Sequence, residues 1–213
     1  MNETRTLPFD DFPINHILIS RMKTLLSSNS VHSVKRIPIG RPAMCYWNAE
    51  DNAIHHGGKV VMGWMIEWVP GLFIQAMDHA VFQAKNGGMA DVTPVQSPRE
   101  NDTGFTTFIV NKRRKFPHSF ELTPPNIFLP LTDDPLVAEY ISLYHENHYA
   151  HCKRVEALIS SGSYSFHRGE IKRDSAHLEE KYAIEHDKYN ESVIETSRKR
   201  KIISSELIKN YFS

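Results

Sequence analysis

The chain has 213 residues and no formal net charge when histidine is counted as neutral. Hydrophobic residues make up 40% of it and charged residues 23%, which is typical of a globular protein with a core of ordinary size. A neutral chain has no overall field that attracts nucleic acid or anionic lipid. We therefore expect neither nucleic acid nor a membrane among its partners.

The cysteine content bears on the cellular compartment. Cys45 and Cys152 are the two cysteines, too few for a disulfide framework, and this favours a reducing compartment. The N-terminal stretch MNETRTLPFDDFP carries acids and a proline where a secretory signal has its apolar core. No apolar run approaches the roughly 18 residues that a membrane span needs. We expect a cytoplasmic protein.

The first quarter of the chain has the patterning of helices. Apolar residues at helical spacing predict an amphipathic helix over about 13–27. A loop with room for a short strand follows. Pro42 in a first turn and the Gly57-Gly58 pair at the end then predict a short helix over 43–55.

Strands are predicted next. Trp64, Ile66 and Trp68 alternate on one face of the first strand, and the turn sequence NGG at 86–88 is a strong hairpin signal. The pattern indicates an antiparallel meander of four strands, over residues 58–71, 72–85, 89–95 and 103–114.

A proline-rich segment over 116–135 marks a boundary. We divide the chain there into an α+β domain, residues 1–131, and a helical C-terminal extension, residues 132–213. Helical spacing predicts one helix over 134–162 and one or two charged helices beyond residue 173. The expected fold class is α+β, with a Cys-bearing helix packed on an antiparallel sheet of about four to six strands.

Three residues could form a nucleophilic site. A reactive thiol needs a base within reach and a group that orients the base. Cys45 falls near the first turn of the predicted helix, where unpaired N–H groups and the helix dipole favour a thiolate. His79 lies on a strand that could pack against this helix, and Asp91, 12 residues later, lies on the next strand. We expect Asp91 to hold the His79 ring in one tautomer.

The segments GGKVVMGWMI, HAVF and GGMADVTP resemble the core of transglutaminase-like proteins, in the wider papain-like cysteine hydrolase superfamily. In that family a Cys-bearing helix leads to a strand of the type Gly-x-x-x-Arg-Val-Val-x-Gly-Tyr. A strand with His-Ala-Trp and a strand ending in Asp-Pro-Thr follow. The resemblance covers residues 43–94. It departs from the family where Val81 replaces the usual tryptophan and where the last motif reads Asp-Val-Thr-Pro.

The resemblance implies a papain-like or transglutaminase-like core in which Cys45 is the nucleophile, His79 the base and Asp91 the orienting residue. The backbone N–H of Cys45 is the natural contributor to an oxyanion hole. Two nearby polar side chains are further candidates for that role, those of Trp47 and Asn48.

Each of these residues also has an ordinary structural interpretation. Cys45 could be a small buried hydrophobe, His79 a core histidine bonded to a carbonyl, and Asp91 a turn cap. Glu67, on a nearby strand, could replace Asp91 as the orienting carboxylate.

A second cluster lies in the C-terminal part. His145, His148 and Cys152 fall at positions i, i+3 and i+7 of a predicted helix and are competent zinc ligands. A complete tetrahedral site would need distant help, for example from His118 or His167. Metal binding is therefore an alternative, and otherwise we expect no metal and no cofactor.

The function we expect is that of a cysteine-dependent hydrolase or acyltransferase that acts on an amide or ester bond. Its substrate would be a peptide, a protein or a small amide or ester. The alternative on the same fold is a catalytically inactive binding protein. The C-terminal helices could then serve as a contact surface, including for self-association into a homo-oligomer.

Overall fold

The computed structural model describes residues 7–95, 99, 101–117, 121–175 and 179–212. The chain is α+β, as expected, and it divides into two compact units. The sheet unit comprises Pro8–His118 and Asn126–Leu131, and the helical unit comprises Met1–Leu7, Ser119–Pro125 and Thr132–Ser213.

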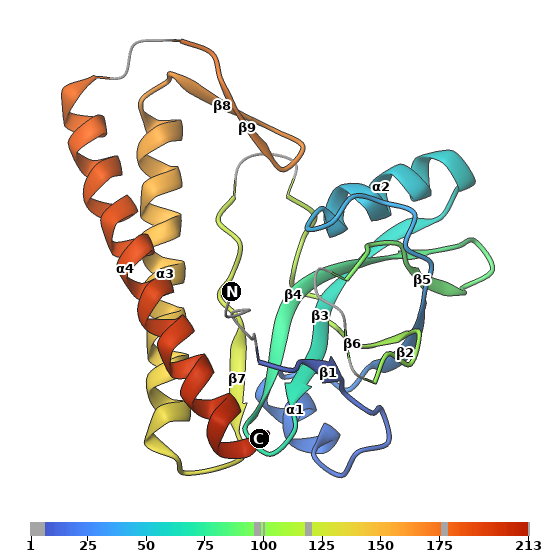
Figure 1. Ribbon diagram of the computed structural model, residues 1–213. Helices are drawn as coiled ribbons and strands as arrows, with labels where there is room; N and C mark the ends of the chain where they lie inside the picture. Colours follow the sequence, from blue (N-terminus) through green and yellow to red (C-terminus); the bar gives the residue numbers. More distant parts are fainter. Residues whose placement is uncertain (1–6, 96–98, 100, 118–120, 176–178, 213) are drawn as a thin grey trace. The chain divides into compact units, whose positions relative to one another are not determined.

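The sheet unit alternates short helices with strands (Figure 1). Its elements are β1 (Asp10–Asp11), α1 (Ile19–Leu25), β2 (Val31–Arg36), α2 (Cys45–His56), β3 (Lys59–Val69), β4 (Phe73–Gln83), β5 (Met89–Asp91), β6 (Phe105–Val110) and β7 (Ile127–Pro130).

The strand order is β1-β3-β6-β2-β5-β4-β7, and β3 also pairs with β4. The extra pairing closes β3, β6, β2, β5 and β4 into a ring. The predicted antiparallel meander is therefore wrong: β6 returns to pair with β3 and β2 rather than with β5, and β2 runs parallel to β5. Closure leaves these strands with less unpaired edge than a meander would present.

One further prediction fails in this unit. The first helix begins at Ile19 instead of residue 13, because the chain turns between Pro13 and His16, where the His16 N–H donates to the Pro13 carbonyl over 3.0 Å. Ile17, which contributed to the helical pattern, is 85% exposed. The proline-rich segment is not only a boundary, because β7 lies within it and pairs with β4.

The ring has an apolar interior and an outer face covered by helices. Val34, Val81 and Phe108 fill the interior. On the outer face, α2 packs over Met62 and Ala80, near the beginning of β3, and α1 lies near the end of β3 (Figure 1). Alternation of side chains along β3 and β4 separates the two faces.

One edge of β4 is only partly paired. β5 pairs with it at Phe82 and Gln83, and β7 pairs with it over Phe73–Ala76. Within the described residues, Met77–Val81 therefore has no strand on that edge, and His79 lies in this gap.

The helical unit contains α3 (Pro135–Ser160), β8 (Tyr164–His167), β9 (Glu170–Arg173) and α4 (Glu180–Tyr211). α3 and α4 lie side by side (Figure 1), and Asn147 of α3 donates to Thr196 and Ser197 of α4 over 2.8 and 3.0 Å. The expectation that this part is entirely helical is wrong at β8 and β9. Arg168 and Gly169 join them with φ values of 47° and 82°, as a tight two-residue hairpin requires. Over the part of the chain that the structure describes, no helix has the length and apolarity needed to cross a membrane.

Candidate active site

The structure brings together the three residues of the predicted nucleophilic site. His79 Nε2 lies 3.0 Å from Asp91 Oδ2, and both side chains are buried, with 7% and 2% of their surfaces exposed. Extension of the β4–β5 register places Asp91 opposite Val81, so His79 and Asp91 are diagonal partners on the inner face of the ring.

The Asp91 carboxylate has two further donors. Thr106 Oγ1 of β6 donates to Asp91 Oδ2 over 2.7 Å, and the Thr93 backbone N–H donates to Oδ1 over 3.2 Å. The Asp91 side chain therefore cannot rotate without breaking three interactions at once. Thr106 is a residue of this site that sequence patterning did not identify, because β6 and β5 lie on either side of β2 only in the folded ring.

Cys45 is the first residue of α2 and is partly exposed. It is close enough to the His79 ring to help raise the pKa of this histidine. Since Asp91 occupies Nε2, the ring nitrogen left for the thiol is Nδ1. The order of burial, with a partly exposed cysteine and a buried carboxylate, suits a nucleophile that a substrate must reach.

The turn before α2 is held in place by Asn48. The Asn48 Oδ1 accepts from the Arg41 N–H over 3.0 Å, while its Nδ2 donates to the Arg41 carbonyl over 2.7 Å and to Thr93 Oγ1 over 3.1 Å. Both N–H groups of the amide are therefore used, so Asn48 is not an oxyanion donor. Trp47 is buried, with its ring 4.9 Å from that of Phe116.

The opposite charges of His79 and Asp91 stabilise each other. Burial opposes a positive His79, but the Asp91 carboxylate and Cys45 outweigh it and raise the pKa of His79 well above its usual range. Burial also disfavours the Asp91 carboxylate, yet His79 and the hydrogen bonds to Asp91 lower the pKa of this carboxyl below its usual value. The site therefore favours an ionised Asp91 beside a protonated His79.

Glu67 does not take the place of Asp91. Its carboxylate is bonded to Arg99 and, over 2.9 Å, to Gln75. Arg99 also binds Asp11, which pairs with Arg36 at 2.6 Å. Glu67 thus belongs to a buried ion network rather than to the nucleophilic site.

A second set of contacts lies next to the one formed by Cys45, His79 and Asp91. The Tyr46 hydroxyl, next to Cys45, donates to Asp78 Oδ2, next to His79, and Arg114 Nε donates to the same oxygen over 3.0 Å. The Asp78 side chain is fully buried, and its Oδ1 has no hydrogen-bond partner among the described residues. The sequence does carry a signal for Tyr46 and Asp78, because each is adjacent in sequence to a residue of the nucleophilic site.

The Tyr46–Asp78 contact links α2 to β4 one residue along from the Cys45–His79 contact. Burial, followed by Asp78, raises the pKa of Tyr46 far above its usual range, so the hydroxyl stays protonated and donates. Burial raises the pKa of Asp78, although Tyr46 and Arg114 oppose this. The contact therefore sets where the start of α2 lies along β4.

Tyr46→Phe is expected to destabilise the sheet unit by about 1.5–3 kcal/mol, since it removes a hydrogen bond to a buried charged group. Urea unfolding followed by tryptophan fluorescence would measure this. Tyr211→Phe is the matched control, because Tyr211 also donates to an aspartate, Asp134, over 2.7 Å, but is exposed. It should leave the midpoint nearly unchanged, and equal effects of the two variants would contradict a special role for Tyr46.

The candidate metal cluster is incomplete. His145, His148 and Cys152 all lie on α3, and Cys152 Sγ is 3.4 Å from His148 Nε2. In the described ranges, no group of three or more His, Cys, Asp or Glu side chains could hold a metal ion. His118, which could have completed the set, lies outside those ranges.

Comparison with known proteins does not assign the chain to a family. No protein-family model, no curated protein and no solved structure matches it.

Proposed function

We propose that the chain is a cysteine-dependent hydrolase or acyltransferase that acts on an amide or ester bond through Cys45, His79 and Asp91. The observation that carries the proposal is the buried His79 ring, 3.0 Å from Asp91, with Cys45 close enough to raise the pKa of this histidine. A buried imidazole between a carboxylate and an accessible thiol is the arrangement that nucleophilic catalysis by cysteine requires.

The geometry supports a two-step reaction. The Cys45 thiolate attacks the substrate carbonyl carbon, and protonated His79 gives its Nδ1 proton to the departing amine or alcohol, which leaves a thioester. His79 then takes a proton from water or from an acceptor amine as that group attacks the thioester, and the thiolate leaves. Water yields hydrolysis and an amine yields acyl transfer.

The start of α2 supplies the stabilisation that this reaction needs. The first N–H groups of a helix have no partner within it, and the Cys45 N–H is the first of α2. We assign it to the developing oxyanion. The papain-like or transglutaminase-like character of the core remains part of this proposal, supported by a Cys-bearing helix that packs on β3 and on β4, the strand that carries the histidine. Both cysteines are free, which is consistent with the cytoplasmic location that we propose.

The test is the pH dependence of Cys45 alkylation by iodoacetamide. Cys152→Ser is present in every variant, so that only one thiol reacts. We expect the rate near neutral pH to depend on His79. In His79→Ala the rate there should fall, because the imidazolium that stabilises the thiolate is gone.

At about pH 6 the two proteins should differ in rate by at least tenfold, since few free thiols are ionised there. Cys45→Ser should not be labelled. A profile that is the same with and without His79, or no labelling of the folded protein, would contradict the proposal. That result would favour an inactive binding protein on the same fold.

A further inference from the structure

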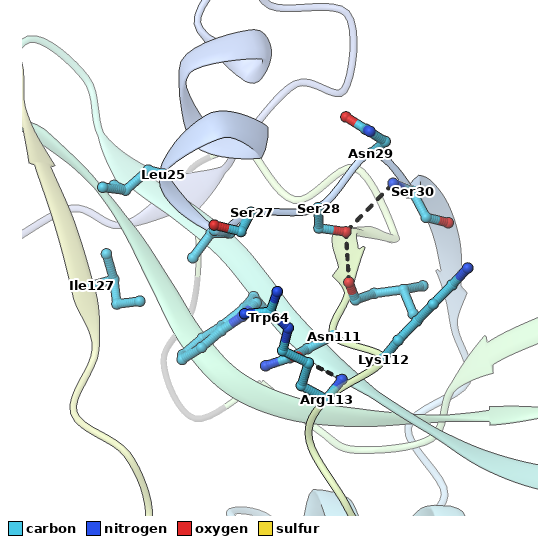
Figure 2. A pocket seen from close by; sticks show the side chains of 12 residues that line it. Leu25, Ser27, Ser28, Asn29, Ser30, Trp64, Asn111, Lys112, Arg113 and Ile127 are labelled. Carbon is cyan, nitrogen blue, oxygen red and sulfur yellow. Dashed lines mark hydrogen bonds between the residues drawn. The ribbon is translucent and has the colours of Figure 1, made fainter.

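A pocket of about 630 Å³ lies on the sheet unit, apart from the nucleophilic site. It is bounded by the end of α1 with the loop that follows, by Trp64 of β3, and by residues 110–113 (Figure 2). Its volume falls in the range of roughly 300–1,000 Å³ that is usual for small-molecule sites. Cys45, His79 and Asp91 are not among its lining residues.

One part of the wall is apolar. Figure 2 shows the Trp64 side chain between Ile127 and Asn111, with Leu25 and Ser27 across the pocket from it. Trp64 is 7% exposed, while Leu25 is 46% exposed. The apolar lining side chains are those of Leu25, Leu26, Trp64, Val110 and Ile127. An aromatic or aliphatic body could pack against this surface.

The other part of the wall is cationic. Lys112 and Arg113 line the pocket, both are exposed, and neither forms an ion pair with a described residue. The lining residues include no aspartate and no glutamate, although acidic and basic residues are equal in number along the chain, 25 of each. The pocket is thus a local concentration of positive charge on a neutral protein.

The cationic turn is held in a fixed position. Asn111 Oδ1 accepts from the backbone N–H groups of Arg113 and Arg114 over 3.1 and 3.3 Å. The loop opposite is fixed to the same strand end, because Ser28 Oγ donates to the Val110 carbonyl over 2.7 Å (Figure 2). Little ordering of the backbone is therefore required when a ligand enters.

We propose that this pocket binds a small organic anion whose carboxylate, phosphate or sulfonate contacts Lys112 and Arg113 and whose apolar body packs on Trp64. Charge complementarity selects an anion, and the apolar wall selects one with an aromatic or aliphatic body over inorganic phosphate. The site acts independently of the proposed reaction at Cys45, so either proposal can fail without the other.

The test uses two fluorescent probes with the full chain. Anilinonaphthalene sulfonate carries the anionic group, and phenylnaphthylamine has the same rings without it. We expect one saturable site for the sulfonate and weaker binding of the neutral probe. Leu25→Glu introduces a carboxylate at an exposed wall position, and Leu25→Gln is its neutral match. The dissociation constant for the sulfonate should be at least about tenfold higher in Leu25→Glu than in Leu25→Gln, with similar affinities for the neutral probe.

A second pair of variants tests the cations. The double variant Lys112→Ala/Arg113→Ala should weaken sulfonate binding, while Lys115→Ala, an exposed basic residue of the same run that does not line the pocket, should not. Equal affinities of Leu25→Glu and Leu25→Gln, equal effects of the two basic variants, or the absence of a saturable site would overturn the proposal. So would light scattering that shows a dimer dissociated by Leu25→Glu, because a second copy would then occupy the pocket.

Discussion

Replacement of Asp91 by alanine is expected to lower the free energy of unfolding by about 3–5 kcal/mol, the usual cost of removing one partner from a buried ion pair. The variant leaves His79, with 7% of its side chain exposed, without its carboxylate, and it removes the acceptor of Thr106. Denaturant unfolding of the wild type and the variant would measure the difference.

The pH dependence of this loss separates an ion pair from a simple hydrogen bond. The pKa of His79 is raised above its usual value of 6.5, so its contribution to stability is complete below pH 6.5 and is lost as the pH rises through the raised pKa. The pKa of Asp91 is lowered from 3.8, so its contribution is complete above pH 3.8 and is lost as the pH falls through the lowered pKa. The difference in the free energy of unfolding between the wild type and the variant should therefore be largest between pH 3.8 and pH 6.5.

Asp91→Asn separates the effect of the Asp91 charge from that of the size and shape of the side chain. It keeps the size of the side chain and an oxygen for Thr106, but it removes the charge that raises the pKa of His79. We expect a smaller stability loss than for Asp91→Ala, together with slower alkylation of Cys45 near neutral pH. If unfolding of Asp91→Ala differs from the wild type by a constant amount from pH 4 to pH 9, the residues do not form an ion pair.

Gly63→Ala is expected to destabilise the sheet unit by about 3 kcal/mol or more, at the upper end of the cost of overpacking. A Cβ at Gly63 would lie 2.3 Å from the Ile109 carbonyl oxygen and 2.4 Å from Phe108 Cζ. The oxygen belongs to the backbone of β6, the strand paired with β3 at this point, so it cannot move without separating the two strands. The expected result is a large fall in the thermal midpoint or a failure to fold.

Gly88→Ala provides the comparison. A Cβ at Gly88 would meet only the Asn86 side chain, at 3.3 Å, and this residue does not need a positive φ. Its thermal midpoint should fall much less than that of Gly63→Ala. Similar midpoints for the two variants would show that close contact between β3 and β6 is not what requires glycine at position 63.

The elements around the nucleophilic site could be predicted from local sequence. The Gly57-Gly58 pair ends α2 as expected, and strand alternation with the NGG turn predicted the pairing of β4 with β5. The diagonal relation of His79 to Asp91 depends only on that one hairpin. Local patterns are sufficient here because the turn sets the register of adjacent strands.

The other contacts of the nucleophilic site depend on the tertiary structure. Closure of the ring brings Thr106 to Asp91, and the gap between β5 and β7 leaves His79 open to the Cys45 thiol. The choice of Asp91 over Glu67 and the Tyr46–Asp78 contact also depend on segments distant in sequence. The pairing of such segments is determined by which apolar faces and charges can be buried together. No local window of the sequence contains both partners, so periodicity and turn signals could not predict these contacts.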